Sequence, residues 1–301
     1  MGKRCLQAVI VLLVVSTLVF FLLRVVGDPA TLMLDPNATK ADYEDLKRSL
    51  GLDQPIHVQY VNFMKDMASL NLGRSYRYKQ PVVNMIKDAL PFTLQLVGVS
   101  LLLAVPLAIV VGVLAAVKRN SLIDSVMTTV TIAGRSIPSF WLGLILMMLF
   151  AVKLKILPPS GWGSLKHLIL PSVTLAMGLA TSTVRMTRNS MLSVMNQDYM
   201  KAAKAKGVSP FRLYIGHGLR NSLIAVITLI SIQVGHLLGG SIVVETVFSY
   251  PGIGRLLINA IMVYDYPVVQ ASVVLMALLF VVINLIVDLL YSVIDPRIRV
   301  R

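Results

Sequence analysis

The sequence has few of the groups that carry covalent or metal chemistry. Its 301 residues include one cysteine, Cys5, so no disulfide framework and no cysteine-based metal site can form within the chain. The four histidines, His57, His167, His217 and His236, show no metal-ligand spacing. No G-x-x-x-x-G-K-[ST] phosphate loop, H-E-x-x-H zinc motif or G-x-S-x-G nucleophile motif is present. We therefore expect no catalytic residues, no metal ligands and no cofactor in this chain.

Charge is also scarce, and what there is has mostly one sign. Charged residues make up 14% of the chain, against about 25% in a typical soluble domain. Hydrophobic residues make up 56%, and the mean hydropathy is +0.78. This composition indicates a polytopic membrane protein. The net charge of +14 would suggest nucleic acid in a soluble protein. Here the basic residues lie in loops between apolar runs, where they orient the chain in a membrane, so we expect no nucleic acid partner.

The apolar runs predict an all-α protein with six transmembrane helices. The first run, residues 5–23, follows two basic residues and is long enough to span a hydrocarbon core of about 30 Å. A signal peptide is the alternative, but no small-x-small cleavage site follows the run. The other five runs cover residues 91–117, 128–152, 168–184, 222–247 and 268–294. Three prolines within or near them are candidate kinks, because neighbouring helices can satisfy the freed carbonyls: Pro106, Pro138 and Pro171.

These runs divide the chain into three parts. Residues 1–27 form the first transmembrane helix, residues 28–90 a long loop with short amphipathic helices, and residues 91–301 a core with the other five. Most basic residues of the short loops fall on the side that holds both termini and the group Lys201–Arg220. By the positive-inside rule this side is the cytoplasm, so the long loop lies outside.

The longest strongly basic stretch, residues 198–223, is therefore cytoplasmic. It reads DYMKAAKAKGVSPFRLYIGHGLRNSL and predicts two short helices with a left-handed turn at Gly207. We expect Asn196 or Asp198 to cap the first helix, and Ser209, followed by Pro210, to start the second. An ordered stretch with no span of its own needs a surface to dock against.

This stretch resembles the cytoplasmic "EAA" loop of ABC-importer permeases, whose pattern is roughly E-A-A-x-x-x-G. Lys201, Ala202, Ala203 and Gly207 occupy those positions, with Lys201 in place of the glutamate. The branch that carries dipeptides, oligopeptides and nickel has D-Y-x-x-x-A-x-A-K-G followed by H-x-L-R-N, and this sequence matches both. Ala225 stands where that branch usually has a proline. Further landmarks of the branch occur in order: LGLDQP (50–55), SIPSFWLG (136–143), ILPS (169–172), GGSIVVE (239–245), PGIG (251–254), DYP (265–267) and DPRIR (295–299).

The resemblance implies a type I ABC-importer permease of the prokaryotic plasma (inner) membrane, driven by ATP and dependent on a binding protein. It also implies a second homologous permease, two cytoplasmic ATPase subunits that bind ATP and Mg, and an external substrate-binding protein. Di- or oligopeptides, including glutathione-like peptides, are the expected cargo, and nickel or a metal–chelator complex is the alternative. An alternative of another class is a membrane scaffold that recruits a cytoplasmic protein without transport. The sequence does not give the cargo, because the external binding protein does most of the selecting.

In this family the loop is a coupling helix that docks on the ATPase. The resemblance therefore assigns ATPase coupling to Asp198, Tyr199, Lys201, Ala202, Ala203, Lys206, Gly207 and His217. The alternative is a basic helix lying on anionic lipid, which would need an apolar face rich in Leu, Phe or Trp. The first predicted helix offers only Tyr199 and Met200 besides its alanines, so we favour docking.

Five residues are candidates for the translocation path. Gly235 and Gly239 allow close helix contact, and this glycine face lines either a helix interface or the path. His236 is either a substrate or metal contact or an interhelical hydrogen-bond partner. Asn284 and Asp288 fall at i and i+4 on one helix face, where such a pair lines a path or holds helices together.

Overall fold

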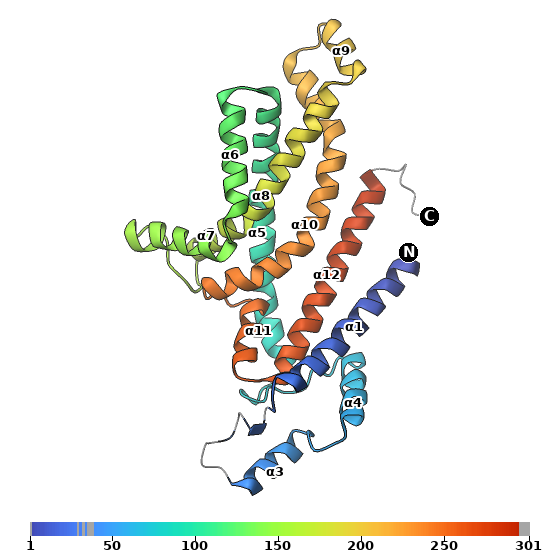
Figure 1. Ribbon diagram of the computed structural model, residues 1–301, viewed down its shortest axis with the longest axis vertical. Helices are drawn as coiled ribbons and strands as arrows, with labels where there is room; N and C mark the ends of the chain where they lie inside the picture. The colour runs from blue at the N-terminus through green and yellow to red at the C-terminus, as the bar shows by residue number, and fades with distance from the viewer. Residues whose placement is uncertain (1, 29, 32–33, 35–38, 295–301) are drawn as a thin grey trace. The chain divides into compact units, whose positions relative to one another are not determined.

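The computed structural model describes residues 2–28, 30–31, 34 and 39–294. Within these ranges the chain is built of helices, with one isolated antiparallel bridge between Arg74 and Pro81. The chain forms two compact units. One comprises residues 1–93 and 251–281, and the other residues 94–250 and 282–301 (Figure 1).

The predicted spans correspond to long apolar helices. Among the described residues, five helices are long and apolar enough to cross a membrane: α1 (Gly2–Val26), α5 (Val82–Val117), α8 (Leu165–Met195), the continuous helix Arg212–Val247, and α12 (Tyr266–Ile294). A bent pair of helices makes a sixth if it is counted as one span. The helices extend beyond the predicted runs. α5, for example, begins nine residues before Pro91, and Val82, Met85 and Ile86 in this extension are buried.

The predicted third span, residues 128–152, is broken at Pro138. α6 (Leu122–Ser136) ends before an extended Ile137, and α7 (Ser139–Leu146) begins after the proline and continues as a π-helix, η1 (Met147–Lys153). The two arms are bent by 106°. A proline pushes the preceding residue out of the helical region, which accounts for the break at Ile137. Pro106 and Pro171, the other candidate kinks, lie inside uninterrupted helices.

The first unit ties the predicted external loop to helices far along the chain. Besides α1 and the start of α5 it contains α3 (Lys40–Ser49), α4 (Ile56–Ala68), α11 (Ile253–Met262) and the start of α12. The buried carboxylate of Asp265 accepts hydrogen bonds from the Ser75 hydroxyl and from the amides of Tyr76 and Arg77. Residues 28–90 therefore form no domain with a core of its own.

The second unit holds the predicted coupling loop. α5 and α8 approach so closely at Gly112 that a Cβ there would lie 2.6 Å from the Thr187 Cβ and 2.8 Å from the Val184 carbonyl oxygen. The buried Val113, Ala116 and Met191 form a core beside this contact. α8 leads into α9 (Asp198–Ala205) at the end of the unit, and the chain returns through a π-helix, η2 (Arg212–Leu219), into α10 (Arg220–Val247) (Figure 1).

Candidate coupling site

α9 is the first of the two helices predicted in residues 198–223, although its cap differs from the prediction. Asn196 is the C-cap of α8, Gln197 holds the N-cap position of α9 without a side-chain hydrogen bond, and Asp198 is the first helical residue. The Asp198 carboxylate accepts from the Lys201 ammonium at 2.9 Å, but both side chains are largely exposed. Such a pair contributes little stability, while an acid in the first turn suits the helix dipole.

Gly207 adopts the predicted left-handed conformation, with φ of +78°. The Gly207 amide donates to the Lys204 carbonyl at 3.0 Å, and the Val208 amide donates to the Ala203 carbonyl at 3.2 Å. These two bonds, with Lys206 as C-cap, form a Schellman motif that ends the helix. A Cβ on Gly207 would meet no atom within 4 Å. The backbone angle, and not lack of space, is therefore what favours glycine here.

The second predicted helix begins at Pro210, as expected, and the Leu213 amide donates to the Ser209 carbonyl at 2.9 Å. It is not a separate short helix, however. It continues through η2 into α10 without a break. The physical reason is that no proline or glycine stands between Arg220 and Val234, and Ala225 replaces the proline expected in this branch. The loop thus has one free-standing helix, α9.

α9 is attached to the unit through two contacts. The Met200 side chain is 3% exposed, although the rest of the helix lies at the surface. The Asn221 side-chain amide donates to the Tyr199 hydroxyl and to the His217 carbonyl, both at 2.9 Å. Asn221 thereby fixes α9 to the start of α10. Sequence reasoning assigned no role to Met200 or Asn221. The signal for Met200 was its place as the one long apolar side chain of an Ala/Lys helix.

The predicted coupling residues come together on this surface. Seven of them are exposed: Asp198, Tyr199, Lys201, Ala202, Lys206, Gly207 and His217. Ala203 is half-buried. The exposed face therefore combines small alanines, which allow close approach of another backbone, with lysine ammonium groups that favour an acidic partner.

A bidentate ion pair between α8 and α6, which the sequence analysis did not predict, lies shortly before α9 along the chain. Arg188 on α8 donates from Nε to Asp124 Oδ1 at 2.7 Å and from its second terminal nitrogen to Asp124 Oδ2 at 2.8 Å. Asp124 lies in the first turn of α6 and also accepts from the Asn120 amide at 3.1 Å. The pair thus joins the start of α6 to α8 about two turns before α8 ends, ahead of α9.

The candidate path residues do not share one environment. Gly235 is buried, whereas His236 and Gly239 lie on an exposed face of α10 with Ile232 and Val243. Asn284 belongs to α12 and is half-buried. The backbone of Asp288 is also in α12, but its side chain lies outside the described part of the structure, as does the DPRIR segment.

The residues that the structure describes include no group of three or more His, Cys, Asp or Glu side chains that could hold a metal ion. His236, the one candidate for such a role in a span, lies on the exposed face of α10.

Comparison with known families matches two models along the chain. Residues 108–300 match the binding-protein-dependent transport system inner membrane component, and residues 1–97 match its N-terminal part. The glutathione transport system permease protein GsiC of Salmonella choleraesuis (strain SC-B67) is 43% identical over 300 residues, covering 99% of this chain and 98% of the relative. GsiC of Escherichia coli (strain K12) is 42% identical with the same coverage. These relatives are permeases, which confirms the prediction of a transport component that is not itself an enzyme.

Solved structures show the same fold. Two chains from inward-facing crystal forms of the MetNI methionine ABC transporter superpose with TM-scores of 0.61 and 0.62 at 21% and 22% sequence identity. The match covers 71% and 70% of this chain and 97% and 96% of those chains. It confirms the predicted type I ABC-importer permease fold. From the match over most of its length and from its full-length relatives, the chain belongs to the family of binding-protein-dependent transport system inner-membrane components.

Proposed function

We propose that this permease imports di- or oligopeptides, including glutathione-like peptides, at the expense of ATP hydrolysed by partner subunits. The observation that supports a peptide as the cargo is the similarity to GsiC, at 43% identity over 99% of the chain. The peptide-branch pattern in residues 198–221 agrees with this cargo. The described side chains form no group of three or more metal ligands, so nothing in this part of the chain favours nickel over a peptide.

The proposed complex contains a second homologous permease, two cytoplasmic ATPase subunits and an external substrate-binding protein. Both termini and α9 face the cytoplasm, and residues 28–90 face outside, as the basic short loops predict. This division gives the three parts of the chain, residues 1–27, 28–90 and 91–301, their roles as first span, external segment and permease core.

α9 is the element that we propose to dock in the ATPase. Its exposed face carries Lys201, Ala202 and Lys206, and its far end is fixed by the turn at Gly207. Because α9 follows α8 directly and Asn221 bonds it to the start of α10, displacement of α9 would act on both spans. Closure of the ATPase pair is then transmitted to the membrane through one short helix.

We assign the translocation path to the exposed face of α10 that carries His236 and Gly239. A histidine is unfavourable in contact with lipid, but it suits a surface covered by a second permease or lined by water. Gly235 on the inner side then serves packing within this subunit. Asn284 and Asp288 on α12 are the other candidates for the translocation path. Substitutions on α10 and on α12 test which of these two helices faces the cargo.

Uptake by the reconstituted complex tests this function. Proteoliposomes that contain both permeases, the ATPases and the binding protein are supplied with labelled glutathione, a labelled dipeptide or nickel. We expect ATP-dependent accumulation of a peptide and none of nickel. Accumulation of nickel alone would contradict the assignment of peptides as cargo. Equilibration of every solute without ATP would contradict the assignment of the complex as an importer.

A further inference from the structure

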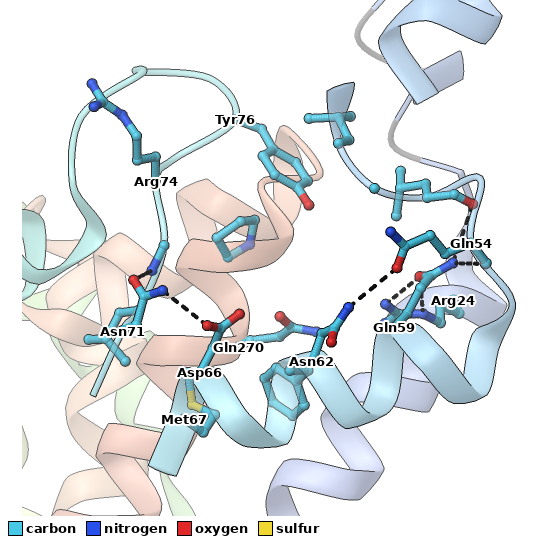
Figure 2. Close-up of a pocket in the computed structure, with 17 residues that line it drawn as sticks. Arg24, Gln54, Gln59, Asn62, Asp66, Met67, Asn71, Arg74, Tyr76 and Gln270 are labelled. Atoms are coloured by element: carbon cyan, nitrogen blue, oxygen red, sulfur yellow. Dashed lines mark hydrogen bonds between the residues drawn. The ribbon is translucent and has the colours of Figure 1, made fainter. Parts of the chain in front are cut away.

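The first unit contains an open polar pocket of about 310 Å³ (Figure 2). It lies between α4, the segment that follows it, and the start of α12. Its volume falls at the lower end of the roughly 300–1,000 Å³ that small-molecule sites occupy. Five side-chain amides, one carboxylate, one hydroxyl and two guanidinium groups make up the polar part of its lining: Gln54, Gln59, Asn62, Asn71, Gln270, Asp66, Tyr76, Arg24 and Arg74. Both arginines donate to protein acceptors, Arg24 to Gln59 and Arg74 to the Lys79 carbonyl.

One wall of the pocket is fixed by hydrogen bonds. Arg24 stacks on the Phe20 ring, with its guanidinium carbon 3.3 Å from the ring centroid, and donates twice to Gln59 Oε1 at 3.2 and 2.8 Å. The Gln59 amide donates in turn to the Gln54 carbonyl at 2.8 Å. Across the pocket, the Asn71 amide holds Asp66 Oδ1 at 3.0 Å. Groups that are held in place before a ligand arrives lose little entropy when it binds.

Other polar groups in the same pocket are not used by the protein. Within the part of the chain that the structure describes, no hydrogen bond is made by the Tyr76 hydroxyl, the Gln270 amide or the Asp66 Oδ2. Tyr76 and Gln270 are half-buried, and Figure 2 shows the Tyr76 hydroxyl directed into the pocket. The Tyr76 hydroxyl is protonated at neutral pH, as in any tyrosine with a pKa near or above 10, and burial raises the pKa further, to about 12, so the hydroxyl can donate.

These free groups define the chemistry of a ligand. The Asp66 carboxylate suits an ammonium group, the Gln270 amide offers a donor and an acceptor side by side as a peptide group does, and the Tyr76 hydroxyl suits a carbonyl. We propose that the pocket binds a short peptide with a free amino group, with this group at Asp66. The choice of a peptide rests on the proposed function. The pocket would hold cargo on the outer side, in the segment that the loop charges place outside the membrane.

Binding of trialanine to the purified full-length chain in lipid nanodiscs tests the proposal by calorimetry. We expect saturable binding, weakened several-fold by Asp66→Asn because a charge-assisted bond at an exposed carboxylate is lost, and by a similar factor by Tyr76→Phe or Gln270→Leu. N-acetyl-trialanine should bind the wild-type chain about as weakly as trialanine binds Asp66→Asn, and acetylation should cost Asp66→Asn nothing further. Lys65→Gln, next to Asp66 but outside the pocket lining, is the matched control and should bind like the wild type.

The acetylation comparison uses wild-type protein, so it stands even where a variant folds poorly. Absence of saturable binding up to about 10 mM, well beyond useful affinity, would overturn the proposal. Equal affinity for acetylated and free trialanine would overturn the assignment of the amino group to Asp66. If Asp66→Asn instead weakens only capture of the external binding protein, the pocket docks a protein and the proposal is wrong. The assay contains no ATPase and measures no transport, so its failure is distinguishable from failure of peptide import.

Discussion

Arg188 donates two hydrogen bonds, at 2.7 and 2.8 Å, to the carboxylate of Asp124, which lies 64 residues earlier in the sequence. The geometry fixes both oxygens of the carboxylate, and the Asp124 side chain is only 7% exposed. The same carboxylate accepts from the Asn120 amide and so also caps the start of α6. One ion pair therefore holds two helices of the second unit together immediately before the proposed coupling helix.

Arg188→Leu should destabilise the subunit and reduce transport. It leaves the Asp124 carboxylate without its main partner in a site with little solvent, at a cost of about 1.5–3 kcal/mol for a bond to a charged group. Thermal unfolding in detergent measures the loss. Asp124→Arg combined with Arg188→Asp should recover only part of it, because an arginine cannot accept from the Asn120 amide. A stability equal to the wild type in Arg188→Leu would show that the pair contributes nothing.

Gly112→Ala should separate α5 from α8. Its new Cβ would lie 2.8 Å from the Val184 carbonyl oxygen, a backbone atom that cannot rotate away. Overpacking of this kind costs about 1–3 kcal/mol. Gly98→Ala in the same helix is the control, because a Cβ there meets nothing within 4 Å. Thermal midpoints of the two variants should differ clearly, and equal midpoints would refute the close approach.

The orientation of the chain is testable with single cysteines in a Cys5→Ser background. Gln80 and Ser209 are both exposed and lie in the segments predicted to face outside and inside, respectively. Ser75 is unsuitable because it is buried and bonded to Asp265. In intact cells an impermeant maleimide should label Gln80→Cys but not Ser209→Cys. The reverse pattern would invert the topology.

Much of the fold was predictable because long apolar runs and special backbone positions leave few choices. Gly207 lies between an Ala/Lys helix and a Ser-Pro helix start, and a left-handed turn there follows from the sequence. Thr39 caps α3 with Asp42, three residues further on, in a capping box. Such features are local, so neighbours in the sequence carry the information.

The features that the sequence did not predict depend on tertiary contacts or on competing local signals. Proline at 138 breaks a helix whereas prolines at 106 and 171 do not, although a single sequence offers the same residue in each case. The ion pair of Arg188 with Asp124 and the hydrogen bonds of Asp265 with Ser75 and Tyr76 join segments far apart in the chain. Gln197 is the N-cap of α9 because Asn196, one of the predicted caps, is the C-cap of α8.

The central claim is that α9 couples this permease to its ATPases through the turn at Gly207. Gly207→Val places a β-branched residue at φ of +78°, which costs on the order of 1–2 kcal/mol, and should swing α9 out of its docking position. Gly216→Ala in η2, where φ is not positive and a Cβ meets nothing, is the matched control. The decisive measurement is ATP-driven peptide uptake by the reconstituted complex, with ATPase retention measured in pull-downs. We predict that Gly207→Val inserts in the membrane but loses uptake and binds the ATPases weakly, while Gly216→Ala retains both; normal uptake by Gly207→Val with its ATPases bound would contradict the coupling role of α9.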